Sequence, residues 1–427
     1  MKNKIGIILF SLLLVSCQFQ KEKTIEIFTK ESVDTTVVLR PDYPESTDTL
    51  RLSNIADSVF YVKLQYRQFD DILNVQYFDS LIFVQDYTAV FAFNPSGELL
   101  YKVLLSPIGC LDVDAENSKF YTYTIKNQIK AYDFKGNELE HFRARVDENG
   151  FYGFYFLAIN DSLFARAEYN AGYNEYELDF INKKGRMIGG IKNVEPHTRT
   201  MNSHTYHESW PRPLFRCSEG LRYHRCYGDT LFAIQPDMTL RPVLIEQKIS
   251  KVPLDKRLES VGGDEIEYRQ YCLDHKLYAT RVFENNHFFI VDYLIGKSWR
   301  EFASCNYLVY DKKTGKLNRI ENDFNAEYDT HKLHLGIFND YDGGLAFAPF
   351  CQSGDYLIMV NAGDVQMGGK DYPKRLYEKG RKMNGEHFVF RSNVYRTSDD
   401  KQRADRFFQN LDEEKETALM IVKLKRL

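Results

Sequence analysis

An internal repeat constrains the fold of this chain more than any other feature of its sequence. A polar turn pair followed by an apolar or aromatic run occurs six times between residues 79 and 360. Repeated units of this size build solenoids or propellers, because each unit buries its apolar face only against its neighbours. The six copies begin at Asp79, Asn117, Asp161, Asp229, Asn286 and Asp355.

The spacing between the copies sets the size of each unit. Measured from one leading Asp or Asn to the next, the spacings are 38, 44, 68, 57 and 69 residues. Each is long enough for four short strands and their turns. The 31 Phe and 29 Tyr residues favour strands, since aromatic side chains fit a pleated surface. We therefore predict an all-β fold: a six-bladed β-propeller of four-stranded blades, with helical insertions in the C-terminal unit.

A second repeated element is a hairpin turn with an Asx residue at its first position and Gly near its end. The Asx side chain bonds the backbone two residues on, and Gly accepts the left-handed conformation that closes the turn. These turns are predicted to join consecutive strands of a blade. They occur at residues 94–97, 133–136, 182–185 and, one residue longer, 311–315, and residues 235–238 stand in the same place without the Gly.

The two ends of the propeller sequence are predicted to close the ring. Residues 372–383 and 398–416 are charged and helix-forming, whereas residues 418–425 alternate as a strand does. A ring of blades usually closes by pairing a strand from one terminus with strands from the other. Residues 57–64 and 418–425 are the natural partners for this pairing.

The first residues have the organisation of an export signal. Positive charge precedes an apolar run at residues 5–15, which is too short to span a bilayer, and Leu14-Val15-Ser16-Cys17 follows. This is the pattern cut by the lipoprotein signal peptidase, which leaves a diacylated Cys17, and two acyl chains anchor a protein stably. The alternative is an ordinary secretory signal that ends at a Cys by chance.

Three segments follow from these patterns. Residues 1–17 are predicted to be the signal peptide, residues 18–50 a polar tether and residues 51–427 the propeller. Two β-prone stretches of the tether, residues 24–28 and 35–39, are available to add an edge strand. The predicted location is the cell envelope, anchored by lipid to the outer membrane and facing the periplasm or the exterior.

The chain resembles the six-bladed β-propeller lipoproteins of Gram-negative gut bacteria from about Leu52 onward. The resemblance rests on residues 52–64, on Tyr227-Gly228-Asp229-Thr230-Leu231-Phe232 and on residues 339–344. Many members have a Gly-rich, Pro-containing loop after the first hairpin, where this chain has only Ser106-Pro107-Ile108-Gly109. The resemblance implies a fold and a membrane anchor, and it supplies no catalytic residues.

Charge and motifs exclude some functions. With 56 basic and 60 acidic residues the net charge is −4, and no long block of one sign marks a nucleic-acid surface. No serine-hydrolase elbow, phosphate-binding loop or dinucleotide fingerprint is present. We predict a binding or scaffolding module for a glycan, a peptide or an envelope protein. The alternative is a lyase or hydrolase with a divalent cation in the central channel, because a propeller can assemble such a site from different blades.

Candidate ligand-binding residues come from two segments. Asp340 and Asp342 precede a Gly pair and offer oxygen ligands to a cation such as Ca²⁺, although the same pattern is typical of an Asx-Gly turn. Trp210 lies in a Pro-rich stretch and is the best candidate for an exposed ring that stacks on a ligand. No further cofactor is predicted.

Histidines and cysteines give weaker signals. His204, His207 and Glu208 could suit Zn²⁺ but lack further ligands, so solvated loop histidines are the simpler interpretation. Six cysteines follow Cys17, and only Cys217 and Cys226 are close enough in sequence to suggest a disulfide. Small buried strand residues are the alternative for both.

Overall fold

The computed structural model describes most of the predicted propeller and two short segments of the predicted tether. The described residues are 25–26, 36–39, 50–66, 68–69, 72–78, 81–105, 109–124, 126–144, 153–168, 175–195, 212–225, 227–247, 251–256, 270–272, 274–295, 303–321, 336–344, 346–360, 394–410 and 417–427.

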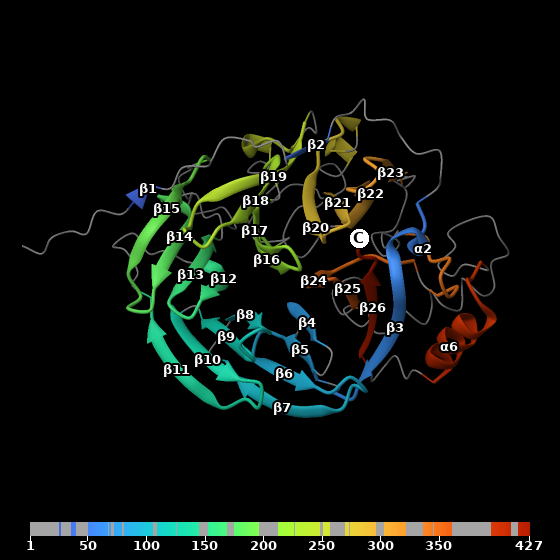
Figure 1. The fold of residues 1–427 in the computed structure, drawn as a ribbon, viewed down its shortest axis with the longest axis horizontal. Helices are drawn as coiled ribbons and strands as arrows, with labels where there is room; N and C mark the ends of the chain where they lie inside the picture. Colours follow the sequence, from blue (N-terminus) through green and yellow to red (C-terminus); the bar gives the residue numbers. More distant parts are fainter. Residues whose placement is uncertain are drawn as a thin grey trace, which may run out of the picture.

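Six sheets, each built on four antiparallel strands, are arranged in a ring around a central axis (Figure 1). In blades I to V, each blade takes these four strands in chain order from the axis outward. Blade I is β4 (Asn74–Phe78), β5 (Leu81–Gln85), β6 (Ala89–Phe93) and β7 (Leu99–Leu104). Blade II is β8 (Gly109–Asp114), β9 (Lys119–Thr124), β10 (Gln128–Asp133) and β11 (Glu138–Arg143). Blade III is β12 (Gly153–Asn160), β13 (Leu163–Glu168), β14 (Tyr176–Asn182) and β15 (Met187–Lys192).

The other half of the ring follows the same order until its last blade. Blade IV is β16 (Leu214–Cys217), β17 (Gly220–His224), β18 (Thr230–Ile234) and β19 (Leu240–Glu246). Blade V is β20 (Ala279–Glu284), β21 (Phe288–Ile295), β22 (Ala303–Asp311) and β23 (Leu317–Glu321). Blade VI is β24 (Cys351–Ser353), β25 (Tyr356–Val360), β26 (Thr417–Leu424) and β3 (Ala56–Leu64). The predicted six-bladed propeller is therefore confirmed.

The ring closes through blade VI, whose outermost strand comes from the N-terminal side. Strand β3 pairs antiparallel with β26 from Thr417↔Leu64 to Leu424↔Ala56. The short helix α2 (Leu52–Ile55) leads into β3, and its buried Leu52 and Ile55 pack with residues of blades V and VI. The predicted closing partners are confirmed.

The repeated turn pair falls on the second strand of five blades. In blade IV it does not, because Asp229-Thr230-Leu231 leads into β18, the third strand, whereas the second strand β17 follows Ser218 and Glu219. The repeat therefore does not occupy the same position in every blade. A polar pair before an apolar strand marks any hairpin strand of a blade, so the pattern does not specify which hairpin it starts.

The Asx turns join the third and fourth strands of blades I, II, III and V. The prediction that these turns connect consecutive strands of a blade is therefore confirmed. Gly97, Gly136, Gly185 and Gly315 all have positive φ there. In blade IV the corresponding residue is Met238, which adopts φ 68° and donates its N–H to Gln235 O at 2.9 Å. Blade IV therefore keeps the turn geometry without its glycine.

The predicted tether contributes two strands to the rim of the ring. Strand β1 (Ile25–Glu26) pairs in parallel with β15, and β2 (Val37–Leu39) pairs in parallel with β19. Figure 1 shows both outside the outermost strands of their blades. Leu39 is buried in the core between blades IV and V, and Thr36 Oγ1 donates to Pro242 O at 3.0 Å. The β-prone stretches seen in the sequence therefore do form edge strands.

Aromatic side chains fill the spaces between neighbouring blades. Phe83 of blade I and Phe120 of blade II have ring centroids 5.2 Å apart, and Tyr123 of blade II stacks on Phe156 of blade III at 5.6 Å. All four are essentially inaccessible to solvent. Rings of this size each bury a large apolar area, so the aromatic content of the sequence is explained mainly by packing between blades.

The C-terminal unit carries one described helix, α6 (Ser398–Gln409). Thr397 caps it by accepting the Asp400 N–H at 3.1 Å, and Phe408 packs edge-on against Tyr61 of β3 at 5.0 Å. The predicted helix at residues 398–416 is confirmed for its first part, while residues 372–383 lie outside the described residues. Among described helices, none is long and apolar enough to cross a membrane.

Gly97 offers a test of how tightly the first blade packs against the closing strand. A Cβ at Gly97 would lie 1.9 Å from Lys63 O of β3, whereas a Cβ at Gly315 would meet no atom closer than 3.9 Å. We expect Gly97→Ala to lower the free energy of unfolding by roughly 2–4 kcal/mol through strain and displacement. Gly315→Ala should lower it by only about 1–2 kcal/mol, the cost of left-handed backbone. Chemical denaturation measures both, and equal losses would contradict the packing argument.

Candidate functional site

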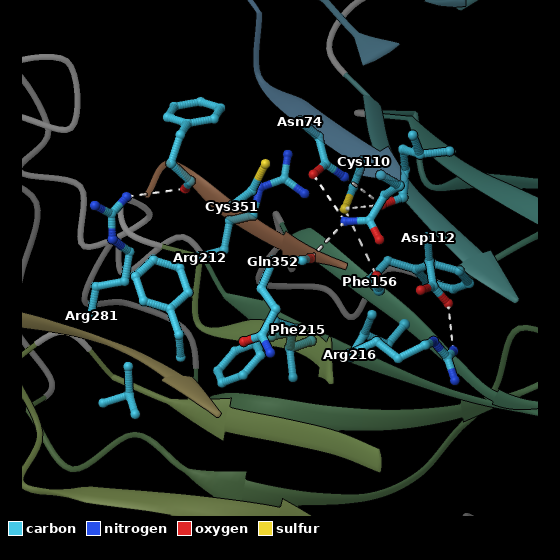
Figure 2. A pocket seen from close by; sticks show the side chains of 17 residues that line it. Asn74, Cys110, Asp112, Phe156, Arg212, Phe215, Arg216, Arg281, Cys351 and Gln352 are labelled. Atoms are coloured by element: carbon cyan, nitrogen blue, oxygen red, sulfur yellow. Dashed lines mark hydrogen bonds and ion pairs between the residues drawn. The ribbon is translucent and has the colours of Figure 1, made fainter. Parts of the chain in front are cut away.

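The central channel collects side chains from all six inner strands (Figure 2). It encloses a space of about 630 Å³, part of it open to solvent. Each inner strand contributes at least one residue, and several are polar although they are largely buried. One representative per blade is Asn74, Asp112, Phe156, Arg216, Arg281 and Gln352.

Three guanidinium groups converge on this channel. Arg216 of β16 forms an ion pair with Asp112 of β8 at 3.0 Å and donates to Ala158 O at 2.8 Å. Burial lowers the pKa of Arg216, but the charge and hydrogen bond of Asp112, together with the charges of Asp114 and Glu116, raise it overall. Arg281 of β20 pairs with buried Asp292. These two arginines are thus tied to carboxylates.

Arg212 differs from the other two arginines because it forms no ion pair within the part of the chain that the structure describes. It precedes β16 in blade IV, yet its Nη2 donates to Leu73 O beside blade I at 2.7 Å. Blades I and IV lie opposite each other in a ring of six. Its guanidinium also lies 6.0 Å from the ring centroid of Tyr155 in blade III. Arg212 therefore extends across the end of the channel at which the inner strands begin.

Arg281 lies toward the same end of the channel. It donates to Phe350 O, immediately before β24, at 3.1 Å. Arg212 and Arg281 each bond a carbonyl at the start of another blade's inner strand, so both guanidiniums are held by fixed acceptors. We call the end of the channel with Arg212 and Arg281 the mouth.

Side-chain amides link neighbouring inner strands near the mouth. Asn74 Nδ2 of β4 donates to Leu111 O of β8 at 3.2 Å. On its other side, Gln76 Nε2 donates to Gln352 O of β24 at 3.3 Å. Because buried amides are costly to leave unpaired, these bonds hold β24, β4 and β8 in fixed positions around the channel.

The carboxylates of the channel are a poor donor set for a divalent cation. Asp112 is the one carboxylate among the described lining residues, and its Oδ2 already accepts from Ala158 N at 2.8 Å as well as from Arg216. A hard cation needs several oxygen ligands, and no group of three or more potential metal ligands occurs among the described residues. The alternative of a channel cation therefore gains no support from these residues.

Two thiols also line the channel, Cys110 of β8 and Cys351 of β24. Both are buried and free. Burial raises the pKa of the Cys351 thiol to about 11, although the nearby Arg212 charge acts in the opposite direction. Burial likewise raises the pKa of Cys110, again opposed by Arg212. Both thiols are protonated at neutral pH. The positive charge of Arg212 acts on the pKa of each of them, so Arg212 lies close to both β8 and β24.

Asp340 and Asp342, predicted as ligand-binding residues, lie beside α2 and β3 and not among the channel-lining residues. Asp340 accepts from the N–H and hydroxyl of Ser53 at 2.9 and 2.6 Å. Asp342 Oδ1 accepts from Asn339 Nδ2 and from Gly344 N, both at 2.8 Å. Both residues are buried, with 8% and 4% exposure. Their described contacts are those of an Asx-Gly turn, and a role in ligand binding stays a prediction.

Several other predicted sites lie outside the described residues: Cys17, Trp210, Cys226, His204, His207 and Glu208. The predicted partner of Cys226 is described, and Cys217 is a free buried cysteine. Cys217 pairs across a tight turn with Gly220.

Sequence analysis missed the arginines of the channel. Each inner strand supplies only one or two of its residues to the site, so no linear motif records the cluster. Arg212 and Arg216 lie just before and within β16, the innermost strand of blade IV. The repeated pair of that blade precedes β18, the third strand, so the repeat did not mark β16 as an inner strand.

Comparison with known proteins gives a family and a fold. Residues 35–423 match the model described as "Domain of unknown function (DUF4934)". No curated protein matches the sequence. A solved structure from Bacteroides fragilis, titled a "putative exported protein", aligns with a TM-score of 0.59 and 13% identity over 92% of this chain and 99% of that one. At this identity the likeness shows the shared fold alone.

Two further structures align less well. A protein of unknown function from Bacteroides caccae gives a TM-score of 0.33 at 7% identity, covering 62% of this chain and 99% of that one. BamB from Moraxella catarrhalis gives 0.33 at 11% identity, covering 61% and 65%. Neither score supports an argument about function.

The channel thiols give a pH-dependent test of the site. Only the thiolate reacts with alkylating reagents, so a pKa of about 11 for Cys351 predicts negligible labelling of the folded protein at pH 7. Labelling should rise steadily as the pH approaches 11, whereas a protein unfolded in denaturant should already react near pH 8–9. Mass spectrometry of labelled peptides identifies Cys351. Fast reaction of folded Cys351 at pH 7 would contradict its burial beside the channel.

Proposed function

The chain belongs to the DUF4934 family of domains of unknown function, and we propose that it is a lipid-anchored extracytoplasmic binding module. In this proposal the channel mouth binds an acidic group of a glycan, a peptide or an envelope protein. The observation that supports the proposal is Arg212, a guanidinium at the mouth that no described carboxylate neutralises. Arg281 adds a second guanidinium beside it.

Charge at the mouth favours an anionic ligand. Of the three channel arginines, Arg216 and Arg281 each have one carboxylate partner within the described residues, so these residues leave the cluster with an excess of positive charge. A guanidinium presents several donors in a plane and recognises a carboxylate through two parallel bonds. Because the mouth is partly shielded from water, such a bond is stronger there than at an open surface.

The apolar part of the channel suits a ligand with a carbon skeleton beside its acidic group. Phe156, Phe215, Phe283 and Phe350 line the same space as the arginines. Aromatic rings stack on sugar faces and on peptide side chains. An acidic oligosaccharide or an acidic peptide therefore fits both properties of the channel, and Trp210, whose sequence position is two residues before Arg212, is a further candidate for contact with it.

Arg212 provides the direct test. We expect Arg212→Gln to weaken binding of acidic oligosaccharides or acidic peptides roughly ten- to hundredfold, the loss of a charge-assisted hydrogen bond. Arg212→Lys should retain part of the affinity because it keeps the charge. Arg143→Gln, an exposed arginine on β11, serves as the control. Calorimetry with each ligand and its uncharged counterpart reads the effect, and equal affinity for wild type and Arg212→Gln would refute the role of Arg212.

The anchor is tested separately through Cys17. The proposal places two acyl chains on this residue, because it directly follows the apolar signal segment. Cys17→Ser should abolish metabolic labelling with a fatty-acid analogue and release the protein from the membrane fraction, while its melting temperature stays unchanged. A Cys17→Ser protein that is still labelled would show that the lipid is elsewhere.

A further inference from the structure

We infer that the docked tether orients the propeller on the bilayer, with its turn face toward the lipid and the arginine-lined mouth away from it. The turn face is the side of the ring that carries the turns between third and fourth strands, such as residues 183–186. This inference rests on the proposed lipid at Cys17. It follows from the directions of β1 and β15 and from the short chain that separates β1 from Cys17.

The two faces are defined by strand direction. In blade III, β14 ends and β15 begins at the turn of residues 183–186, and Lys183 N donates to Ser162 O of the turn between β12 and β13 at 3.2 Å. Both turns are therefore on one face. Since β12 runs antiparallel to β13, it begins at the opposite face. The inner strands of the other blades begin there as well, which places Arg212 and the mouth opposite the turns.

The direction of β1 shows from which face the chain arrives. Ile25 pairs with Gly189 and Glu26 with Gly190, in parallel with β15. Strand β15 runs from the turn face toward the mouth face, so β1 does too, and its first residue is on the turn-face side. The described chain therefore enters β1 from the turn-face side.

The length of the chain between Cys17 and β1 limits the distance between blade III and the membrane. Seven residues lie between Cys17 and Ile25, so a fully extended chain spans at most about 28 Å between these two residues. If the first attachment were at Leu50, the reach would be roughly 115 Å and any orientation would be accessible. In this proposal, docking of β1 keeps blade III within the shorter distance of the bilayer.

The turn nearest this attachment can meet a lipid surface. Lys183 and Lys184 are exposed at its tip. Lys183 forms an ion pair with Glu140 at 3.0 Å, whereas Lys184 forms no ion pair in the described part of the chain. A lysine within a Debye length of an anionic surface is attracted to it and contributes about 1 kcal/mol to the free energy of binding. The charge of Lys184 therefore favours the face at which the described chain enters β1.

Two positions on blade III test this orientation as a matched pair. Lys184 is in the turn, and Val194, 66% exposed, follows the other end of β15. We would label Lys184→Cys and Val194→Cys with a fluorophore in the full, lipidated chain, after reconstitution into liposomes that contain phosphatidylglycerol and a headgroup-linked quencher. The unsubstituted chain, labelled in parallel, gives the background from native cysteines. We expect Lys184→Cys to lose most of its fluorescence and Val194→Cys to lose little.

The outcomes separate this inference from the proposed anchor. Equal quenching at both positions, or stronger quenching at Val194→Cys, in a protein that carries its lipid would overturn the orientation and leave the anchor intact. A chain that carries no lipid on Cys17 would overturn both. Inserting about 20 Gly and Ser residues between Cys17 and Ile25 should reduce the contrast, because such a linker is flexible. An undiminished contrast would show that the short tether does not set the orientation.

Discussion

The pairing of β3 with β26 is the interaction on which the rest of the structure depends. It joins residues that are more than 350 positions apart in sequence, and every other blade lies between them along the chain. A ring of sheets leaves its first and last blades without a neighbour until this pairing forms. Once it forms, Phe60 and Val62 of β3 can pack against blade I, and Tyr61 can receive the rings of α6. The closing strand therefore connects the first blade, the last blade and the C-terminal helix in one core.

Closure also determines the chemistry of the channel. Because the inner strands meet around one axis, a side chain that points inward faces residues from other blades, and a charge there needs a partner from another part of the chain. Asp112 of blade II satisfies this need for Arg216 of blade IV and for the N–H of Ala158 in blade III. Arg281 instead pairs with Asp292 from the neighbouring strand of its own blade. Among the described residues, Arg212 contacts the carbonyl Leu73 O and the ring of Tyr155 but no carboxylate, so the positive charge that these residues leave uncompensated is at the mouth.

The sequence was informative wherever structure is determined locally. Turns depend on a few adjacent residues, so Asx and Gly identified the third-to-fourth strand turns, and the alternation in residues 418–425 identified the closing strand. The same locality explains why the copy at Asp229 precedes a different strand of its blade, since a polar pair before an apolar run does not reveal its place within a blade. The channel site was out of reach, because Arg212, Arg216 and Arg281 are brought together only by the ring. Asp340 and Asp342 show the converse: adjacent acids that look like a ligand set are bonded to Ser53, Asn339 and Gly344.

The degeneracy of the repeat has a physical counterpart in the contacts between blades. Six sheets of similar shape could pack in several orders if their faces were only apolar, because aromatic packing is not strongly directional. The polar contacts differ at each junction. Arg166 of blade III, bound to Asp179, also donates to Tyr123 of blade II at 3.3 Å, whereas Arg222 of blade IV pairs with Glu284 of blade V. A buried charge that meets the wrong blade would lose its partner at a cost of several kcal/mol. The sequence differences that obscure the repeat are therefore the same differences that assign each blade to its neighbours.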